Sequence, residues 1–356
     1  MPTSCWIDPV LSEVYDHLTV AHSEYINSVT HIQFAFQSNV VCLYFMAVDY
    51  YTVTEQEAGQ RIDNFLIRYF KNVPKSVIYR IVRKGEVRVD KKRVKPEKKL
   101  ELGESIRIPP VKLDVETQHP DDKAAIASDT LLSTLEQAVL REDEQLIFIN
   151  KPAGLPVHSG SGYKLGLIEA FRQLRPNLPY VELAHRIDRD TSGIVILAKS
   201  RPALVELHEL FRNGSIDKRY LALVAGKWTH GRQHIQINLG KEEGNRRKVQ
   251  VMEEGKESET IFAPVKNLKG ASLIEAQILT GRMHQIRVQL QHLEHPILGD
   301  ERYGDFGLNR QMREKGLKRM FLHAANVNLV LHLTGRRYVV EAPLPPDLKT
   351  VLNNLK

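Results

Sequence analysis

The 356-residue chain is poor in cysteine and has no long apolar run. Its only cysteines are Cys5 and Cys42, which excludes a disulfide framework and a cysteine-rich zinc site and is typical of a reducing cytoplasm. The apolar run from Val40 to Val48 ends at Asp49, so it is shorter than the roughly 20 residues that a membrane span needs. We therefore expect a cytoplasmic protein without a membrane segment.

Basic residues are missing from the start of the chain. None of the 50 lysines and arginines precedes Arg61. A secretory signal would begin with positive charge, so this segment is not read as one. We hypothesise that the functional chain starts at Met46 and that residues 1–45 are an upstream extension with little fold of their own. The alternative is a genuine N-terminal extension of atypical composition.

Positive charge is instead concentrated in one short segment. The chain has a formal net charge of +7, yet residues 61–107 alone contain 15 Lys and Arg against 6 Asp and Glu. Such a concentration favours a polyanionic partner. Apolar spacing predicts helices over residues 61–69 and 76–83. Alternation predicts strands at 87–90 and 105–108, with a turn at 91–93. We predict a small α/β module over residues 57–110.

This module resembles a known RNA-binding domain. The order R-I-D-N-F-L, V-P-K-S-V-I-Y-R-I-V-R-K-G-E-V-R-V-D and L-x-x-G-E-S-I-R-I-P is similar to the S4-type domain. The resemblance implies that basic side chains contact RNA, mainly at phosphates, and so supply affinity more than sequence choice. A solvated charged face is the alternative. The candidate contacts are Arg83, Lys84, Arg88, Lys91, Lys92 and Arg93.

The charge then reverses. Residues 111–145 contain 3 Lys and Arg against 9 Asp and Glu, with little periodicity outside 131–140. We predict an acidic linker over residues 111–140, which lets the basic module move relative to a larger domain over residues 141–356.

The most informative stretch is H-R-I-D-R-D-T-S-G at residues 185–193, followed by the apolar run I-V-I-L-A. Such a run predicts a strand covered on both faces. Asp188 would then lie at the edge of a core between Arg186 and Arg189. A guanidinium can keep such a carboxylate ionised while one face stays open to a substrate. The alternative is a capped loop with surface ion pairs.

The stretch H-R-I-D-R-D-T-S-G-I-V-I-L-A-K resembles the signature of the RluA/RluC-type pseudouridine synthases, which isomerise uridines in structured RNA. N-K-P-A-G-L-P-V-H, K-R-Y-L-A-L-V and T-G-R-M-H-Q-I-R are similar to further motifs of that family. The resemblance implies an α+β fold, with a mixed, largely antiparallel sheet and flanking helices behind the S4-like module. It makes Asp188 the catalytic aspartate, Tyr220 the ring that packs on the target base and Arg287 the partner that keeps Asp188 ionised.

Two residues near Asp188 have expected roles in handling RNA. Arg186 is expected to occupy the space that the uridine vacates when it leaves its stack. His185 is expected to orient the loop rather than take part in the chemistry. Without the family resemblance, Tyr220 would be read as a core residue.

Neither a cofactor nor a metal is expected, because the isomerisation consumes no donor. His284, His292 and His295 match no zinc spacing. The expected substrate is large-subunit ribosomal RNA or a pre-ribosomal particle, with the RluC branch favoured and no obligatory protein partner evident. Three alternatives stay open: an RluD-like or other RNA specificity, a non-catalytic ribosome-assembly factor, and a nucleoside or glycoside hydrolase.

Overall fold

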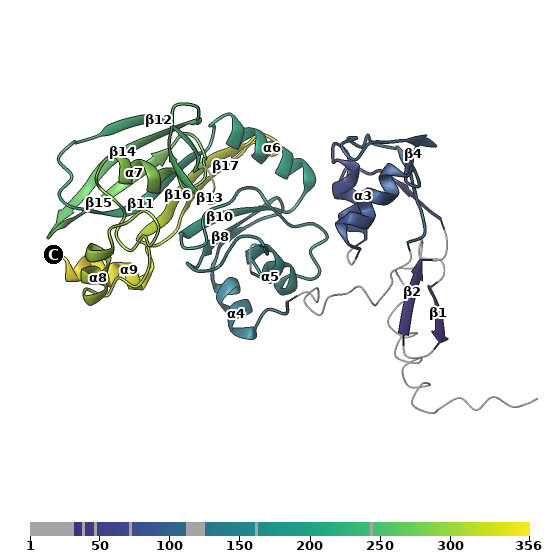
Figure 1. Cartoon of the computed structure of the whole chain (residues 1–356), viewed down its shortest axis with the longest axis horizontal. Helices are drawn as coiled ribbons and strands as arrows, with labels where there is room; N and C mark the ends of the chain where they lie inside the picture. The colour runs from purple at the N-terminus through teal and green to yellow at the C-terminus, as the bar shows by residue number, and fades with distance from the viewer. Residues whose placement is uncertain are drawn as a thin grey trace, which may run out of the picture. The chain divides into compact units, whose positions relative to one another are not determined.

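The computed structural model describes residues 32–37, 40–45, 48–70, 73–111, 125–160, 163–242 and 245–356. The chain divides into two compact units, residues 1–122 and 123–356 (Figure 1). Within the described ranges, no helix is long and apolar enough to cross a membrane. The proposed start at Met46 and the first 31 residues lie outside what the structure describes.

The first unit contains a small four-stranded antiparallel sheet in the order β3-β6-β4-β5, with two helices. Apolar residues of both helices and of the sheet share one core. A separate antiparallel hairpin, β1 with β2, lies within the segment expected to have little fold. The elements are β1 (Ile32–Gln37), β2 (Val40–Phe45), β3 (Asp49–Thr52), α2 (Ile62–Tyr69), α3 (Lys75–Arg83), β4 (Arg88–Val89), β5 (Lys92–Arg93) and β6 (Ser105–Ile108).

Two details of this unit differ from the sequence prediction. The turn lies at Asp90 and Lys91, which have positive φ of 46° and 67°, and the next two residues form β5 instead of continuing the turn. Two successive left-handed residues are the geometry of a tight hairpin turn. Strand β3 was not predicted, because it is a short strand of mostly exposed residues with no apolar alternation.

The second unit is built on an 11-stranded sheet in the order β13-β12-β14-β15-β11-β16-β10-β8-β7, with β17 paired to β16 and β9 to β10. Among the described strands, only β10 and β16 run parallel, so the predicted mixed, largely antiparallel sheet is confirmed. The strands are β7 (Val139–Glu142), β8 (Leu146–Lys151), β9 (Glu182–Leu183), β10 (Ser192–Ala198), β11 (Asp217–Ala225), β12 (Gln233–Glu242), β13 (Asn245–Val251), β14 (Lys256–Leu268), β15 (Ala271–Ile278), β16 (Leu322–Leu331) and β17 (Arg336–Glu341).

Helices pack against both faces of this sheet at its centre. They are α4 (Asp129–Gln137), α5 (Leu167–Leu174), α6 (Arg201–Arg212), α7 (Gln285–His292), α8 (Phe306–Glu314) and α9 (Pro346–Asn354). Helix α4 lies within the span predicted as linker, where Ser128 caps its first turn and Leu135 packs into the core beside α5. The unit boundary at residue 122 thus precedes the end of the predicted linker.

Strand β10 is buried along its whole length, as its apolar run predicts. Ile194 and Ile196 pack with α6 on one face, whereas Val195 and Leu197 pack with α5 on the other. At the start of the strand, Gly193 has a φ of +111°, and a Cβ there would lie 2.2 Å from the carbonyl oxygen of Ala324. Only glycine fits this approach, which brings β16 against the loop that carries Asp188.

Candidate active site

Asp188 lies in the loop between β9 and β10, and this loop is tied to the end of β8. Lys151 is fully buried, and its Nζ donates to the carbonyl oxygens of Pro152, Leu155 and Arg189, each at 2.9 Å. The last of these belongs to the residue after Asp188. A buried ammonium with three acceptors has all its protons bonded, so Lys151 fixes the backbone beside the carboxylate.

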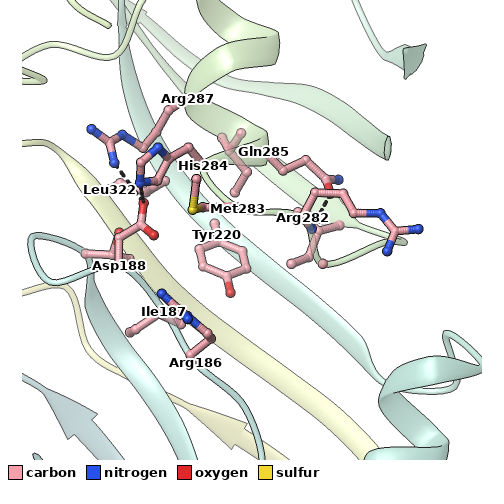
Figure 2. A pocket seen from close by; sticks show the side chains of 14 residues that line it. Arg186, Ile187, Asp188, Tyr220, Arg282, Met283, His284, Gln285, Arg287 and Leu322 are labelled. Carbon is pink, nitrogen blue, oxygen red and sulfur yellow. Dashed lines mark hydrogen bonds and ion pairs between the residues drawn. The ribbon is translucent and has the colours of Figure 1, made fainter. Parts of the chain in front are cut away.

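Arg287 orients the Asp188 side chain from the first turns of α7. Its Nη1 donates to Oδ2 of Asp188 at 2.9 Å (Figure 2). The ion pair expected from the sequence is therefore present. In the described part of the chain, no group donates to the other oxygen, Oδ1, and the Asp188 side chain is 24% exposed. One carboxylate oxygen is thus held and the other is open to the pocket.

The fork of the Arg287 guanidinium is directed at a second carboxylate, which sequence reasoning missed. Nε and Nη2 donate to the two oxygens of Asp300 at 2.7 and 2.9 Å. Asp300 is 1% exposed, and its Oδ1 also accepts from the backbone N–H groups of Arg302 and Tyr303. Burial alone would raise the pKa of Asp300, but the hydrogen bonds and charge of Arg287 lower it below its usual value. Arg287 therefore makes its bidentate contact with Asp300, and it reaches Asp188 through Nη1 alone.

The same network fixes the charge of Arg287. Burial opposes its protonation, but the hydrogen bonds to Asp300 and the charges of both carboxylates raise the pKa of Arg287 above its usual value. The guanidinium also lies 4.9 Å from the ring centroid of Tyr303. Arg287 is thus a permanent cation with a fixed orientation before any substrate arrives.

His284 approaches Asp188 from the start of α7. Its Nε2 lies 3.9 Å from Oδ2 of Asp188, and its Nδ1 lies 2.8 Å from the hydroxyl of Tyr303. The backbone of His284 is left-handed, with φ 55° and ψ 22°. The sequence analysis considered His284 only as a possible metal ligand and rejected that interpretation. Within the described residues, no group of three or more His, Cys, Asp or Glu side chains could hold a metal ion.

Tyr220 and Arg186 complete the pocket that Figure 2 shows. Tyr220 comes from β11 and is 8% exposed. Burial and the negative charge of Asp188 raise the pKa of Tyr220, so its phenol stays protonated at neutral pH. Arg186 is exposed at the rim. No ion pair or hydrogen bond of Arg186 is seen within the ranges that the structure covers, which leaves its guanidinium available to a ligand.

His185 is placed differently from the other candidates. Its Nε2 accepts a hydrogen bond from the backbone N–H of Ile196 at 3.0 Å, and its ring lies 4.8 Å from that of Phe211. Burial, together with the charge of Lys218, lowers the pKa of His185 to about 3. A neutral imidazole bonded to β10 fits the orienting role expected of it better than contact with RNA.

The structure therefore brings Arg186, Asp188, Tyr220 and Arg287 around one pocket, with His284 and Arg282 also lining it. The six basic candidates of the first unit are all exposed, on and around α3, β4 and β5. Arg83, Lys84, Arg88, Lys91, Lys92 and Arg93 thus remain candidate RNA contacts of that unit.

Comparison with known proteins defines the class of this molecule. Residues 145–292 match the RNA pseudouridylate synthase family, and residues 60–106 match the S4 domain. The protein is an RNA-modifying isomerase with a separate RNA-binding domain.

The chain matches similar proteins over nearly their whole length. The chain is 46% identical over 312 residues to the ribosomal large subunit pseudouridine synthase C of Pasteurella multocida, covering 87% of this chain and 94% of that protein. It is 46% identical to the protein of the same name from Escherichia coli K12, covering 85% and 95%. A solved structure, human RNA pseudouridylate synthase domain containing 4, is 25% identical with a TM-score of 0.54, covering 64% of this chain and 95% of that one. The chain belongs to the RNA pseudouridine synthase family.

Proposed function

We propose that this enzyme converts specific uridines of the large-subunit (23S) ribosomal RNA to pseudouridine, as an RluC-like synthase, with Asp188 as the catalytic group. The high identity to relatives named for the large ribosomal subunit supports the choice of RNA. The observation that carries the catalytic role is the Asp188 carboxylate, with Oδ2 held by Arg287 and Oδ1 open to the pocket. Free rRNA or a pre-ribosomal particle in the cytoplasm is the proposed substrate.

The chemistry needs one carboxylate beside the ribose. The N1–C1′ bond breaks, a C5–C1′ bond forms, C5 loses a proton and N1 gains one. Attack on C1′, attack on base C6 and removal of a sugar proton each use an open carboxylate oxygen, which Oδ1 of Asp188 provides. A second carboxylate, as glycosidases use, is not needed, since the detached base is retained and rejoined.

Tyr220 and Arg186 have roles in holding the extruded base. The ring of Tyr220 lines the pocket beside Asp188 and offers a flat face for stacking. Its protonated hydroxyl is a hydrogen-bond donor and not a base at neutral pH. Arg186 at the rim fills the vacated stack, which offsets part of the few kcal/mol that extrusion costs.

The test is a comparison of wild type and Asp188→Asn on unmodified large-subunit RNA, with pseudouridine detected by chemical labelling and primer extension. The matched control is Asp190→Asn, because Asp190 is in the same loop but pairs with Arg189. We expect the Asp188 variant to bind RNA and form no pseudouridine, and the control to stay within a few-fold of wild type. Absence of product with the wild type would remove this RNA as the substrate, and activity in Asp188→Asn would remove Asp188 as the catalyst.

A further inference from the structure

The His284 side chain is held in the pocket by a backbone conformation that is costly for most residues. Its left-handed φ and ψ are strained for a residue with a Cβ. In return, the imidazole lies above the Asp188 carboxylate and is only 11% exposed (Figure 2). Residues in such conformations cluster at functional sites, so the imidazole calls for a chemical explanation.

The hydrogen bonds of Tyr303 fix the tautomer of His284. The Tyr303 hydroxyl accepts from the backbone N–H of Val249 at 2.9 Å and lies 2.8 Å from Nδ1 of His284. Tyr303 is 2% exposed, and its hydroxyl proton has no other acceptor among the described residues, so that proton is directed to Nδ1. Nδ1 is then the acceptor, and Nε2 carries the imidazole proton.

The surroundings keep both rings in these protonation states. Burial raises the pKa of Tyr303, so its phenol is not ionised. Burial lowers the pKa of His284; the charge of Asp188 opposes this effect and that of Arg287 adds to it. His284 is therefore a neutral imidazole. The charged groups that face it are Asp188, Arg287, Asp300 and Arg302.

The Nε2–H group of His284 has no acceptor within hydrogen-bond distance among the described residues. Oδ2 of Asp188 lies 3.9 Å from Nε2 and already accepts from Arg287. A donor that lines a pocket and has no protein acceptor is available to a ligand bound there. The uracil ring offers two suitable acceptors, O2 and O4.

We propose that Nε2–H of His284 donates a hydrogen bond to a carbonyl oxygen of the target uracil while its glycosidic bond is broken. This inference rests on the proposed role of Asp188 at the ribose. The electron pair of the C1′–N1 bond passes into the base, and its negative charge spreads over O2 and O4. The hydrogen bond stabilises that charge, and no proton leaves His284. A fixed donor at a developing oxyanion is one of the strongest catalytic devices of proteins.

Substitutions test the donor directly. His284→Asn keeps a residue type that tolerates the left-handed backbone but removes the donor at Nε2. His284→Gln places an amide nitrogen near the position of Nε2. We expect the single-turnover rate of the Asn variant to fall about 10²-fold, with RNA affinity within a factor of about two of wild type. The Gln variant should recover part of the loss. His292→Asn, at the far end of the same helix, is the matched control.

Thio-substituted substrates test the contact without relying on a folded variant. Sulfur accepts hydrogen bonds poorly, so RNA with 2-thiouridine or 4-thiouridine at the target position should slow the wild type at one of the two. The same substitution should cause no further loss in His284→Asn. Equal thio effects in both proteins, no thio effect in the wild type, or an unchanged rate in His284→Asn would each overturn the proposal. Failure of the proposed function is distinguishable, because the wild type would then modify no unsubstituted RNA.

Discussion

Substitution of Asp300 by asparagine tests whether this buried carboxylate, which does not line the pocket, fixes the orientation of Asp188, the proposed catalytic group. Oδ1 of Asp300 accepts from Nη2 of Arg287 and from two backbone N–H groups, whereas Oδ2 accepts only from Nε of Arg287. In Asp300→Asn the amide nitrogen therefore takes the position of Oδ2, because this choice breaks one hydrogen bond instead of three. The amide N–H group then faces the Nε–H group of Arg287.

The expected loss of stability follows from these contacts. A hydrogen bond to a charged group contributes about 1.5–3 kcal/mol, and removing one partner of a buried ion pair costs about 3–5 kcal/mol. Asp188 still neutralises part of the Arg287 charge. We therefore expect the free energy of unfolding of Asp300→Asn to fall by about 3 kcal/mol, measured by urea denaturation at pH 7.

The loss of stability in Asp300→Asn should depend on pH in a defined direction. The folded pKa of Asp300 is lowered, so its contribution to stability is fully present above the unfolded pKa of about 4 and is lost as pH falls through the folded value. The difference between wild type and Asp300→Asn should be constant at neutral pH and shrink in acid.

The catalytic rate of Asp300→Asn should also fall, because the Arg287 guanidinium loses part of its hydrogen bonding to residue 300. Arg287 freed from Asp300 no longer holds Asp188 in one orientation, and a displacement of about 1 Å costs about 10²-fold in rate. RNA affinity should not change. Asp305→Asn is the control, since Asp305 only caps α8 and asparagine caps equally well. Wild-type stability and rate in Asp300→Asn would refute the reasoning.

Four further outcomes are expected. Asp143 is 13% exposed, and although burial alone would raise its pKa, its hydrogen bonds lower that pKa to about 2. The ionised carboxylate should therefore contribute about 2 kcal/mol of stability above pH 4. Urea denaturation of Asp143→Asn should show no such acid-sensitive contribution. Gly193→Ala should lower the melting temperature strongly or prevent folding, because its Cβ has no space. Tyr220→Phe should leave the melting temperature close to that of the wild type, because the Tyr220 hydroxyl has no hydrogen-bond partner among the described residues, and wild-type pH–rate profiles should show no tyrosine ionisation near neutrality. Replacing Lys91 and Lys92 by alanine should flatten the salt dependence of RNA binding by about one to two in the log–log slope.

Strong local patterns predicted the elements that carry the site. The β-branched run at residues 194–198 gave a strand that is buried throughout, because one such run can satisfy both faces only in the interior of a sheet. The position of Asp188 at the entry of that strand followed from the same pattern. Arg287 as its partner came from family resemblance, since the two residues are 99 positions apart in the sequence and no local pattern signals their contact.

The residues that hold Arg287 and His284 in place could not be predicted in the same way. Asp300 and Tyr303 lie in an irregular loop after α7, and their contacts with Arg287 and His284 exist only because that loop returns to the start of the helix. Hydrophobic periodicity predicts which face of a helix or strand is buried, but it does not predict which residues an irregular loop contacts. The left-handed backbone of His284 was equally invisible, because histidine gives no sequence signal for that conformation.

The arrangement explains why the pocket is organised before substrate binding. Asp300 is satisfied by four hydrogen bonds from Arg287 and two backbone groups, so the guanidinium cannot rotate away from Asp188 without leaving a buried charge unpaired. Tyr303, from the same loop, holds Nδ1 of His284. Two hydrogen-bonding positions then stay unused around Asp188 in the described structure, Oδ1 of the carboxylate and Nε2–H of His284. One is an acceptor suited to the ribose and the other a donor suited to the base, so the free site already separates the two charges that develop when a glycosidic bond is broken.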